Sequence, residues 1–245
     1  VMKVFITDAG YKHTLGAIRS LGQRNIQVEA GAERPWAIGF FSKYCKRRIL
    51  YPNPRKGLTF INFISEMIKK ENYDVVLPIG YATTVKISQF KHMLSSHAKI
   101  PIADYKILKI GADKSKTLTV AENLGIPTPK TFRPKSLRDV KEASKKFSYP
   151  LVVKSSVETG KMYYANSPEE LVAESIKLSD VGVGKKRMPL VQEYIPGRGY
   201  GFFALFNRGK PRAIFMHKRI REYPITGGPS VIAESIYEPK LKEYG

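Results

Sequence analysis

The sequence predicts an α/β fold in which a parallel sheet covered by helices precedes a mixed α+β block. Two observations on the order of segments support this prediction. Over about the first hundred residues, short apolar segments alternate with segments of helical periodicity, and from Ala112 onward strand-like segments follow one another more closely. The chain has 245 residues, 42% of them hydrophobic, and is therefore long enough to form two or three compact units.

The first part has the strand and helix order of a Rossmann-like unit. Its opening strand is followed by a loop and then by Leu15, Ile18 and Leu21 at helical spacing. No GxGxxG motif follows that strand, so the pattern gives little support to a dinucleotide site. We expect the loops at 8–13 and 78–84 to line the crevice where such sheets bind ligands. The predicted strands are 3–7, 27–30, 48–51 and 74–79, and the predicted helices are about 14–24 and 58–70.

A boundary is predicted near Ala112, where Asp113 opens a helix that ends before a Pro-rich segment at 126–129. Beyond it, a Gly- and Lys-rich loop at 182–188 separates the α+β block from a final set of strands. The predicted strands are 130–132, 150–154, 161–165, 190–195, 200–206 and 211–219, with a turn at 207–210, and the predicted helices are 136–147 and 168–178.

Composition argues against several classes of protein. The single cysteine, Cys45, excludes an intrachain disulfide, and no CxxC or HExxH motif offers a metal-ligand set. Because no apolar run approaches a membrane span and no signal-peptide pattern opens the chain, we expect a cytoplasmic protein without a membrane partner. The net charge of +21 favours polyanions, but the basic residues are spread over the whole chain without an aromatic-interleaved motif, which argues against specific nucleic-acid binding.

Four segments resemble the ATP-grasp superfamily in their order and approximate spacing: ADKSKT with Lys114, ENLGIPTPKT, YPLVVKSS with Lys154, and VQEYIPG. The segments VFITDAGYKHTLGAIRSLG and SKYCKRRILYPNP similarly resemble the domain that precedes the grasp in carbamoyl-phosphate synthase-like and carboxylate-amine ligase-like members. The resemblance implies a Rossmann-like pre-ATP-grasp domain at 1–111, the N-terminal lid subdomain of the grasp at 112–188, and the start of its C-terminal subdomain at 189–245.

Two lysines are the predicted phosphate ligands. Lys154 closes an apolar strand, and a lysine ammonium is a compact point charge suited to phosphate oxygens. The resemblance implies that Lys154 contacts the α- and β-phosphates and that Lys114 approaches from a neighbouring element, with ordinary surface lysines as the alternative. It also implies a flap over the phosphates from Ser155 to Gly160, where a plain hairpin turn is an equal alternative because the segment has a single glycine.

The predicted adenine site is a hinge that, by resemblance, consists of Gln192, Glu193, Tyr194 and Ile195. The backbone N–H and C=O groups of such a segment can match the donor and acceptor edge of adenine. We expect Gln192 or Glu193 near the adenine amino group and Ile195 on the base plane, and an ordinary alternating strand is the alternative. Many family members place a ribose-binding acid four positions after the apolar hinge residue, where this chain has Gly199.

A basic segment at 217–224 precedes the Gly-containing loop at 226–230 and resembles the region that faces the γ-phosphate and the acyl phosphate. Arginine suits a transferring phosphoryl group because its planar fork binds bidentately. We expect Arg219 and Arg221 to face opposite sides of their strand, and we favour Arg219 with His217 as the catalytic pair. A solvated basic strand edge is the alternative.

The resemblance implies an ATP-dependent ligase that activates a carboxylate as an acyl phosphate for attack by an amine. Its cofactors would be ATP and Mg²⁺, and its partners a small carboxylate and an amine. The magnesium ligands of such enzymes are carboxylate and amide oxygens, which we expect C-terminal to Gly245, so the chain alone is expected to be an inactive, incomplete grasp. The alternative is a non-catalytic ATP-binding or regulatory module, and a sheet edge or helix of the first part could support a homodimer.

Overall fold

The computed structural model describes residues 1–156, 162–179, 187–225 and 228–245. The chain divides into two compact units, unit 1 (Val1–Ala112) and unit 2 (Asp113–Gly245). Among the described residues, no helix is long and apolar enough to cross a membrane.

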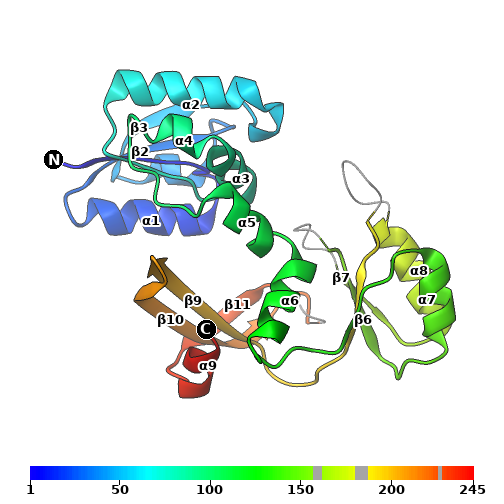
Figure 1. Ribbon diagram of the computed structural model, residues 1–245. Helices are drawn as coiled ribbons and strands as arrows, with labels where there is room; N and C mark the ends of the chain where they lie inside the picture. The colour runs from blue at the N-terminus through cyan, green and yellow to red at the C-terminus, as the bar shows by residue number, and fades with distance from the viewer. Residues whose placement is uncertain (157–161, 180–186, 226–227) are drawn as a thin grey trace. The chain divides into compact units, whose positions relative to one another are not determined.

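Unit 1 is built on a four-stranded parallel sheet (Figure 1). Its strands are β1 (Lys3–Ile6), β2 (Gln27–Ala32), β3 (Cys45–Leu50) and β4 (Val75–Leu77), in the order β3-β2-β1-β4. The helices are α1 (Lys12–Gly22), α2 (Leu58–Glu71), α3 (Tyr81–Gln89), α4 (Lys91–Leu94) and α5 (Tyr105–Gly111), with 3-10 turns η1 (Ile38–Phe41) and η2 (Pro54–Lys56). Parallel neighbours need a crossover connection, which α1 supplies between β1 and β2.

The helices α1 and α2 cover opposite faces of this sheet (Figure 1). Phe5 is buried on the α2 side together with Phe60 and Ile64. Its neighbour Ile6 is buried on the α1 side with Ile18. Successive side chains of a strand alternate between faces, so an apolar segment without polar interruptions is what a sheet covered on both sides requires.

The strands predicted for unit 1 and its two longer helices are confirmed, with ends that differ by a few residues. The prediction of a loop at 78–84 is wrong in its second half, because α3 begins at Tyr81. The β-branched Thr83 and Thr84 disfavour a helix, but Ile87 is fully buried in the core on the α2 side and Thr83 is also buried. Tertiary packing therefore decides the conformation of this segment.

Unit 2 begins with α6 (Lys114–Asn123) and an antiparallel sheet that two helices cover on one face (Figure 1). The strands are β5 (Thr131–Phe132), β6 (Leu151–Lys154), β7 (Met162–Ala165) and β8 (Leu190–Glu193), in the order β5-β8-β6-β7. The helices α7 (Leu137–Ser144) and α8 (Pro168–Ser179) contribute Val140 and Leu171 to a core that includes Val153 and Val191. The α+β character predicted for this region is confirmed.

A second antiparallel sheet follows in unit 2, with the order β11-β10-β9. It consists of β9 (Tyr200–Asn207), β10 (Lys210–Glu222) and β11 (Ser230–Ser235), and α9 (Pro239–Tyr244) ends the chain. The predicted turn at 207–210 is confirmed, and Arg208 and Gly209 both have positive φ (51° and 75°), which is typical of a tight hairpin turn. The sequence did not predict β11 or α9.

The strand β10 contains an irregularity between Arg219 and Arg221, which pair with the adjacent residues Ala233 and Ile232 of β11. Residues two apart share a face of a regular strand, and the extra residue Ile220 shifts that alternation. In a regular strand, Arg219 and Arg221 would share one face. The β-bulge places them on opposite sides, which is the expected arrangement but has a different cause.

Candidate nucleotide site

Lys154 is the last residue of β6, where it pairs with Leu190 of β8 and Met162 of β7. Cross-strand partners share a face of a sheet. The alternate residues Val153 and Val191 belong to the core beneath α7 and α8. Lys154 therefore projects from the face opposite the two helices. The residues that share this face with it are Val152, Met162, Tyr164, Leu190 and Gln192.

Lys114 is the first residue of α6, and its backbone N–H donates to the Ser156 carbonyl oxygen at 3.2 Å. This hydrogen bond places the start of α6 beside the end of β6. Asp113 caps the helix, because its carboxylate accepts from the backbone N–H of Ser115 at 3.1 Å. The same carboxylate pairs with Arg187 at 3.2 Å, so the start of α6 is also tied to the segment that leads into β8.

The two lysines influence each other electrostatically. Burial lowers the pKa of Lys154, and the positive charge of Lys114 lowers it further. In the described part of the chain, no carboxylate forms an ion pair with Lys154. The Lys154 ammonium is partly buried and lies near a second positive charge, and an anion would stabilise such an arrangement.

The side chains of the predicted adenine hinge have different surroundings. Gln192 is buried, and its Nε2 donates to Thr131 Oγ1 at 2.8 Å. A Glu193 carboxylate oxygen accepts from the backbone N–H of Lys130 at 2.8 Å. Since both side chains have partners within the sheet, Ile195, which is 60% exposed, is the hinge side chain best placed to contact a base.

Tyr164 was missed by sequence reasoning and lies next to the hinge. Its ring meets that of Tyr194 edge-on, with centroids 5.8 Å apart. Burial raises the pKa of Tyr164, and Tyr194 and Glu222 raise it further. Alternation along β7 was the signal that could have found it, since Tyr164 lies two residues from Met162, the partner of Lys154.

His217 and Arg219 lie two residues apart in the regular part of β10 and therefore share one face. Two glycines lie beside them, Gly201 in β9 and Gly199 just before that strand. A Cβ at Gly201 would fall 2.4 Å from His217 Cε1, and a Cβ at Gly199 would fall 2.8 Å from Arg219 Cδ. The His217 ring also stacks on Phe203 at 5.4 Å. The absence of a side chain at position 199 thus leaves room for Arg219.

Two nitrogen atoms on this face have no hydrogen-bond partner in the described part of the chain, namely Nε2 of His217 and Nε of Arg219, although both are buried. Buried polar groups normally have partners, so these atoms are candidates for contact with a ligand. Arg219 Nη1 donates to a Glu222 carboxylate oxygen at 3.2 Å. Glu222 was not predicted, because two register shifts, between Arg219 and Arg221 and between Arg221 and Glu222, separate it from the regular part of β10.

Part of the predicted site lies outside the described residues, namely Gly160 with most of the flap and the pair at 226–227. Ser155 is described and is buried. Within the described ranges, no group of three His, Cys, Asp or Glu side chains could hold a metal ion. Neighbouring ammonium groups are chemically suited to phosphate oxygens, whereas the described residues offer no fitting set of ligands for magnesium.

In sequence, the chain is similar to the carbamoyl phosphate synthase large chain of Caldanaerobacter subterraneus subsp. tengcongensis. The two are 26% identical over 132 residues, which is 53% of this chain and 12% of the synthase chain. No protein-family model matches the chain.

In structure, the chain is similar to L-amino acid ligase from Bacillus licheniformis, with a TM-score of 0.73, 14% identity and coverage of 99% of this chain and 57% of the ligase. It is also similar to the biotin carboxylase domain of 2-oxoglutarate carboxylase from Hydrogenobacter thermophilus, with a TM-score of 0.70, 19% identity and coverage of 99% and 55%. The chain thus spans little more than half of these solved structures. The similarities show that it has an ATP-grasp, carboxylate-amine ligase-like fold.

Proposed function

We propose that this chain provides the nucleotide-binding part of an ATP-dependent ligase that activates a carboxylate for attack by an amine. The observation that carries the proposal is the pair of ammonium groups at the end of β6. Lys154 is partly buried, has no carboxylate partner in the described chain, and lies close enough to Lys114 for its pKa to be lowered. A site for phosphate groups explains why such an unfavourable arrangement is present.

In this proposal, Lys154 neutralises the α- and β-phosphates and Lys114 approaches them from the start of α6. The adenine edge is matched by the backbone of the hinge, and Ile195 contacts the base plane. Gln192 and Glu193 shape the hinge through their bonds to Thr131 and Lys130 and do not bind the base with their side chains.

The proposed chemistry has two steps. An oxygen of the substrate carboxylate attacks the γ-phosphorus of ATP, ADP leaves, and an acyl phosphate forms. The amine nitrogen then attacks the acyl carbon, phosphate leaves, and the nitrogen loses a proton. Arg219 and His217 face the transferring phosphoryl group in this scheme, and their role is to stabilise its charge. Because the described residues offer no fitting magnesium ligands, no step is assigned to the metal.

The proposal also assigns a domain to each part of the chain. Residues 1–111 form a Rossmann-like domain that precedes the grasp, 112–188 form its N-terminal subdomain, and 189–245 begin its C-terminal subdomain. The parallel sheet of unit 1 supports the first assignment. A cytoplasmic location and a homodimer stay predictions.

Calorimetric titration of ATP into the wild-type chain, Lys154→Ala and Lys146→Ala tests the proposal. Lys146 is an exposed lysine of the same unit and serves as the matched control. We expect the wild type and Lys146→Ala to bind ATP equally, and Lys154→Ala to bind at least about tenfold more weakly, since a hydrogen bond to a charged group contributes about 1.5–3 kcal/mol. Equal binding by all three proteins would refute the assignment of Lys154.

Nucleotide binding and turnover are separated by a second measurement. Release of ADP by the longest natural form of the chain, in the presence of candidate carboxylates and amines, supports a ligase. ATP binding without ADP release under any of these conditions would favour the regulatory module instead.

A further inference from the structure

Unit 1 contains a cavity of about 560 Å³ at the carboxyl ends of three adjacent strands, β1, β2 and β3. Ligands of open α/β sheets bind at this edge, and the volume suits a small molecule. The cavity belongs entirely to unit 1 and does not include the lysine pair. The polar and aromatic residues that line it are Asp8, Tyr11, Glu33, Arg34, Trp36 and Tyr51.

Asp8 lines the cavity, and several hydrogen bonds hold its carboxylate in place. Its backbone has a positive φ of 61°, which is uncommon for a residue with a side chain. One carboxylate oxygen accepts from the Gly80 N–H at 2.6 Å and from the hydroxyls of Thr83 and Thr7. The other accepts from the Tyr51 hydroxyl at 3.1 Å. Among the described residues, the second oxygen has one donor, whereas the first has three, so the second is the oxygen that can take a donor from a ligand.

Gly80 shows how closely this carboxylate is positioned. A Cβ at Gly80 would fall 2.7 Å from the Asp8 carboxyl group. Tyr51 supports the arrangement from the other side, because its hydroxyl oxygen accepts from the Asp8 backbone N–H at 2.9 Å. Backbone strain that its surroundings maintain in this way is concentrated at functional sites.

The charge of the cavity is opposite to that of the chain. Two carboxylates, Asp8 and Glu33, face a single guanidinium, Arg34, in a protein whose net charge is +21. Glu33 is fixed at the rim by the Asn53 side-chain amide, which donates to its carboxylate at 2.6 Å. An excess of fixed carboxylates favours a cationic ligand, and ammonium groups donate hydrogen bonds to such oxygens.

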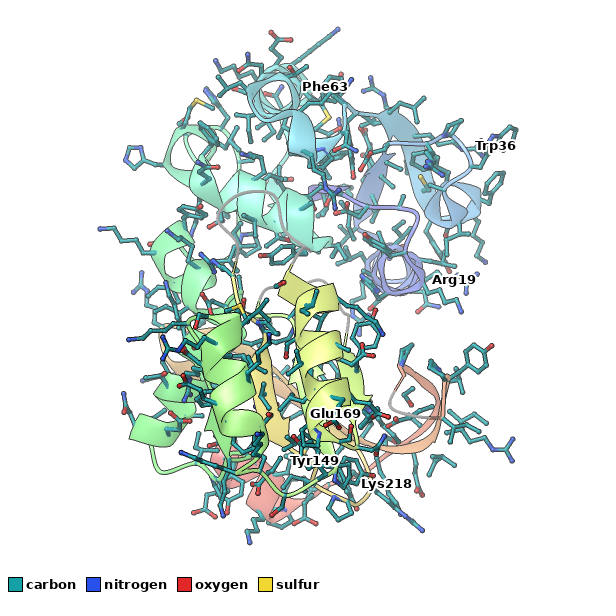
Figure 2. The ribbon with its side chains drawn as sticks, turned by 90° about the vertical axis from the view of Figure 1, so that its right-hand side faces the viewer. Arg19, Trp36, Phe63, Tyr149, Glu169 and Lys218 are labelled. Atoms are coloured by element: carbon teal, nitrogen blue, oxygen red, sulfur yellow. The ribbon has the colours of Figure 1, made fainter. Side chains whose placement is uncertain are left out.

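The aromatic rim points to the same ligand class. Trp36 is the single tryptophan of the chain and is 81% exposed, and Figure 2 shows its side chain at the outer margin of unit 1. Tyr11 is half-exposed on the same cavity. Exposed aromatic faces attract cations, tryptophan most strongly. We infer that this cavity binds a small ligand that carries a primary ammonium group, with the ammonium at the Asp8 and Glu33 carboxylates.

Assigning the ligand as the amine that attacks the activated carboxylate rests on the proposed function. Binding of an ammonium compound to unit 1 does not, because none of the cavity residues belongs to the proposed nucleotide site.

Because Trp36 is the single tryptophan of the chain and lines this cavity, tryptophan fluorescence can follow binding there. The experiment titrates the whole chain, at constant ionic strength and neutral pH, with n-butylammonium, n-butanol and n-butyrate. These probes share the same carbon chain and differ in charge. We expect a saturable change in Trp36 fluorescence with n-butylammonium, and a response at least about tenfold weaker with the other two, on the scale of one charge-assisted hydrogen bond.

Two variants and a control make the test specific. Glu33→Gln removes a rim carboxylate, and Gly80→Ala displaces the Asp8 carboxylate while its φ of −71° stays available to alanine. Each is expected to weaken n-butylammonium binding about 2- to 5-fold. Glu66→Gln, which alters an exposed glutamate of α2, is expected to leave binding unchanged.

Equal responses to the three probes, no response from the folded wild type, or unchanged binding in both Glu33→Gln and Gly80→Ala would overturn the inference. A chain that binds ATP but not n-butylammonium would overturn it while leaving the proposed nucleotide site in place. The reverse result would refute the nucleotide site and leave the ammonium site standing.

Discussion

Substitution of Lys154 by methionine is predicted to change stability and ATP binding in opposite directions. Methionine has a side chain of similar length without the charge. In the free chain the Lys154 ammonium is partly buried, lies near Lys114 and has no carboxylate partner among the described residues. Its removal relieves that cost, so we expect unit 2 to be stabilised by about 1 kcal/mol. For a domain of this size, such a gain raises Tm by about 2–4 °C.

The same substitution removes a charge-assisted hydrogen bond to phosphate, which contributes about 1.5–3 kcal/mol. ATP should therefore bind about 10- to 150-fold more weakly. Scanning calorimetry measures the first effect and titration calorimetry the second, with Lys146→Met as the control that changes neither by a comparable amount. If Lys154→Met lowers Tm and leaves ATP affinity unchanged, Lys154 is a structural residue and the reasoning fails.

Three further predictions concern the same unit. The pKa of Lys154 is lowered from the ordinary value of 10.5, so just below pH 10.5 the unfolded chain holds more protons than the folded chain, and stability should rise with pH there. ATP affinity should fall over the same window, by at most about tenfold per pH unit, because Lys154 loses its charge. Calorimetry across this window checks both trends, and a similar fall in ATP affinity for Lys154→Arg would contradict the assignment. Gly201→Ala should displace the His217 ring and destabilise the chain by about 1–3 kcal/mol in denaturant unfolding, and unchanged His217 ring resonances would argue against the packing described. Glu222→Gln should alter stability by less than about 1 kcal/mol, because the ion pair of Glu222 with Arg219 is partly exposed. The same substitution should tighten ATP binding, because it frees the Arg219 guanidinium. Weaker ATP binding would show that Glu222 has another role.

The parts of the site that depend on local pattern could be predicted from the sequence. The position of Lys154 could be predicted because the apolar run before it specifies a buried strand, and the cap at Asp113 fixes the start of α6 and so the position of Lys114. The phosphate-binding role of both lysines is implied by the resemblance and stays a prediction. Both features are set within a few residues of chain, where propensity and capping chemistry act directly.

The parts that depend on pairing between distant segments could not be predicted. The bonds from Gln192 to Thr131 and from Glu193 to Lys130 exist because β8 lies beside β5, which is far from it in sequence. The bulge at Ile220 likewise exists only in the pairing of β10 with β11, and that strand was not predicted.

In unit 1, too, the local features could be predicted from the sequence and those that depend on distant segments could not. Its strands follow from apolar periodicity, but the cavity at their ends depends on the fixed position of Asp8. That position is set by Tyr51, which follows β3, and by Gly80 and Thr83 at the start of α3. No local pattern specifies this convergence, although the segments 8–13 and 78–84 are both expected at the strand ends.

The most direct test of the central claim is a crystal structure of the chain with ADP or a non-hydrolysable ATP analogue. We predict phosphate oxygens within about 4 Å of the ammonium nitrogens of Lys154 and Lys114, the distance of an ion pair, and the base against Ile195. A nucleotide bound elsewhere, with neither lysine in contact with its phosphates, would contradict the account.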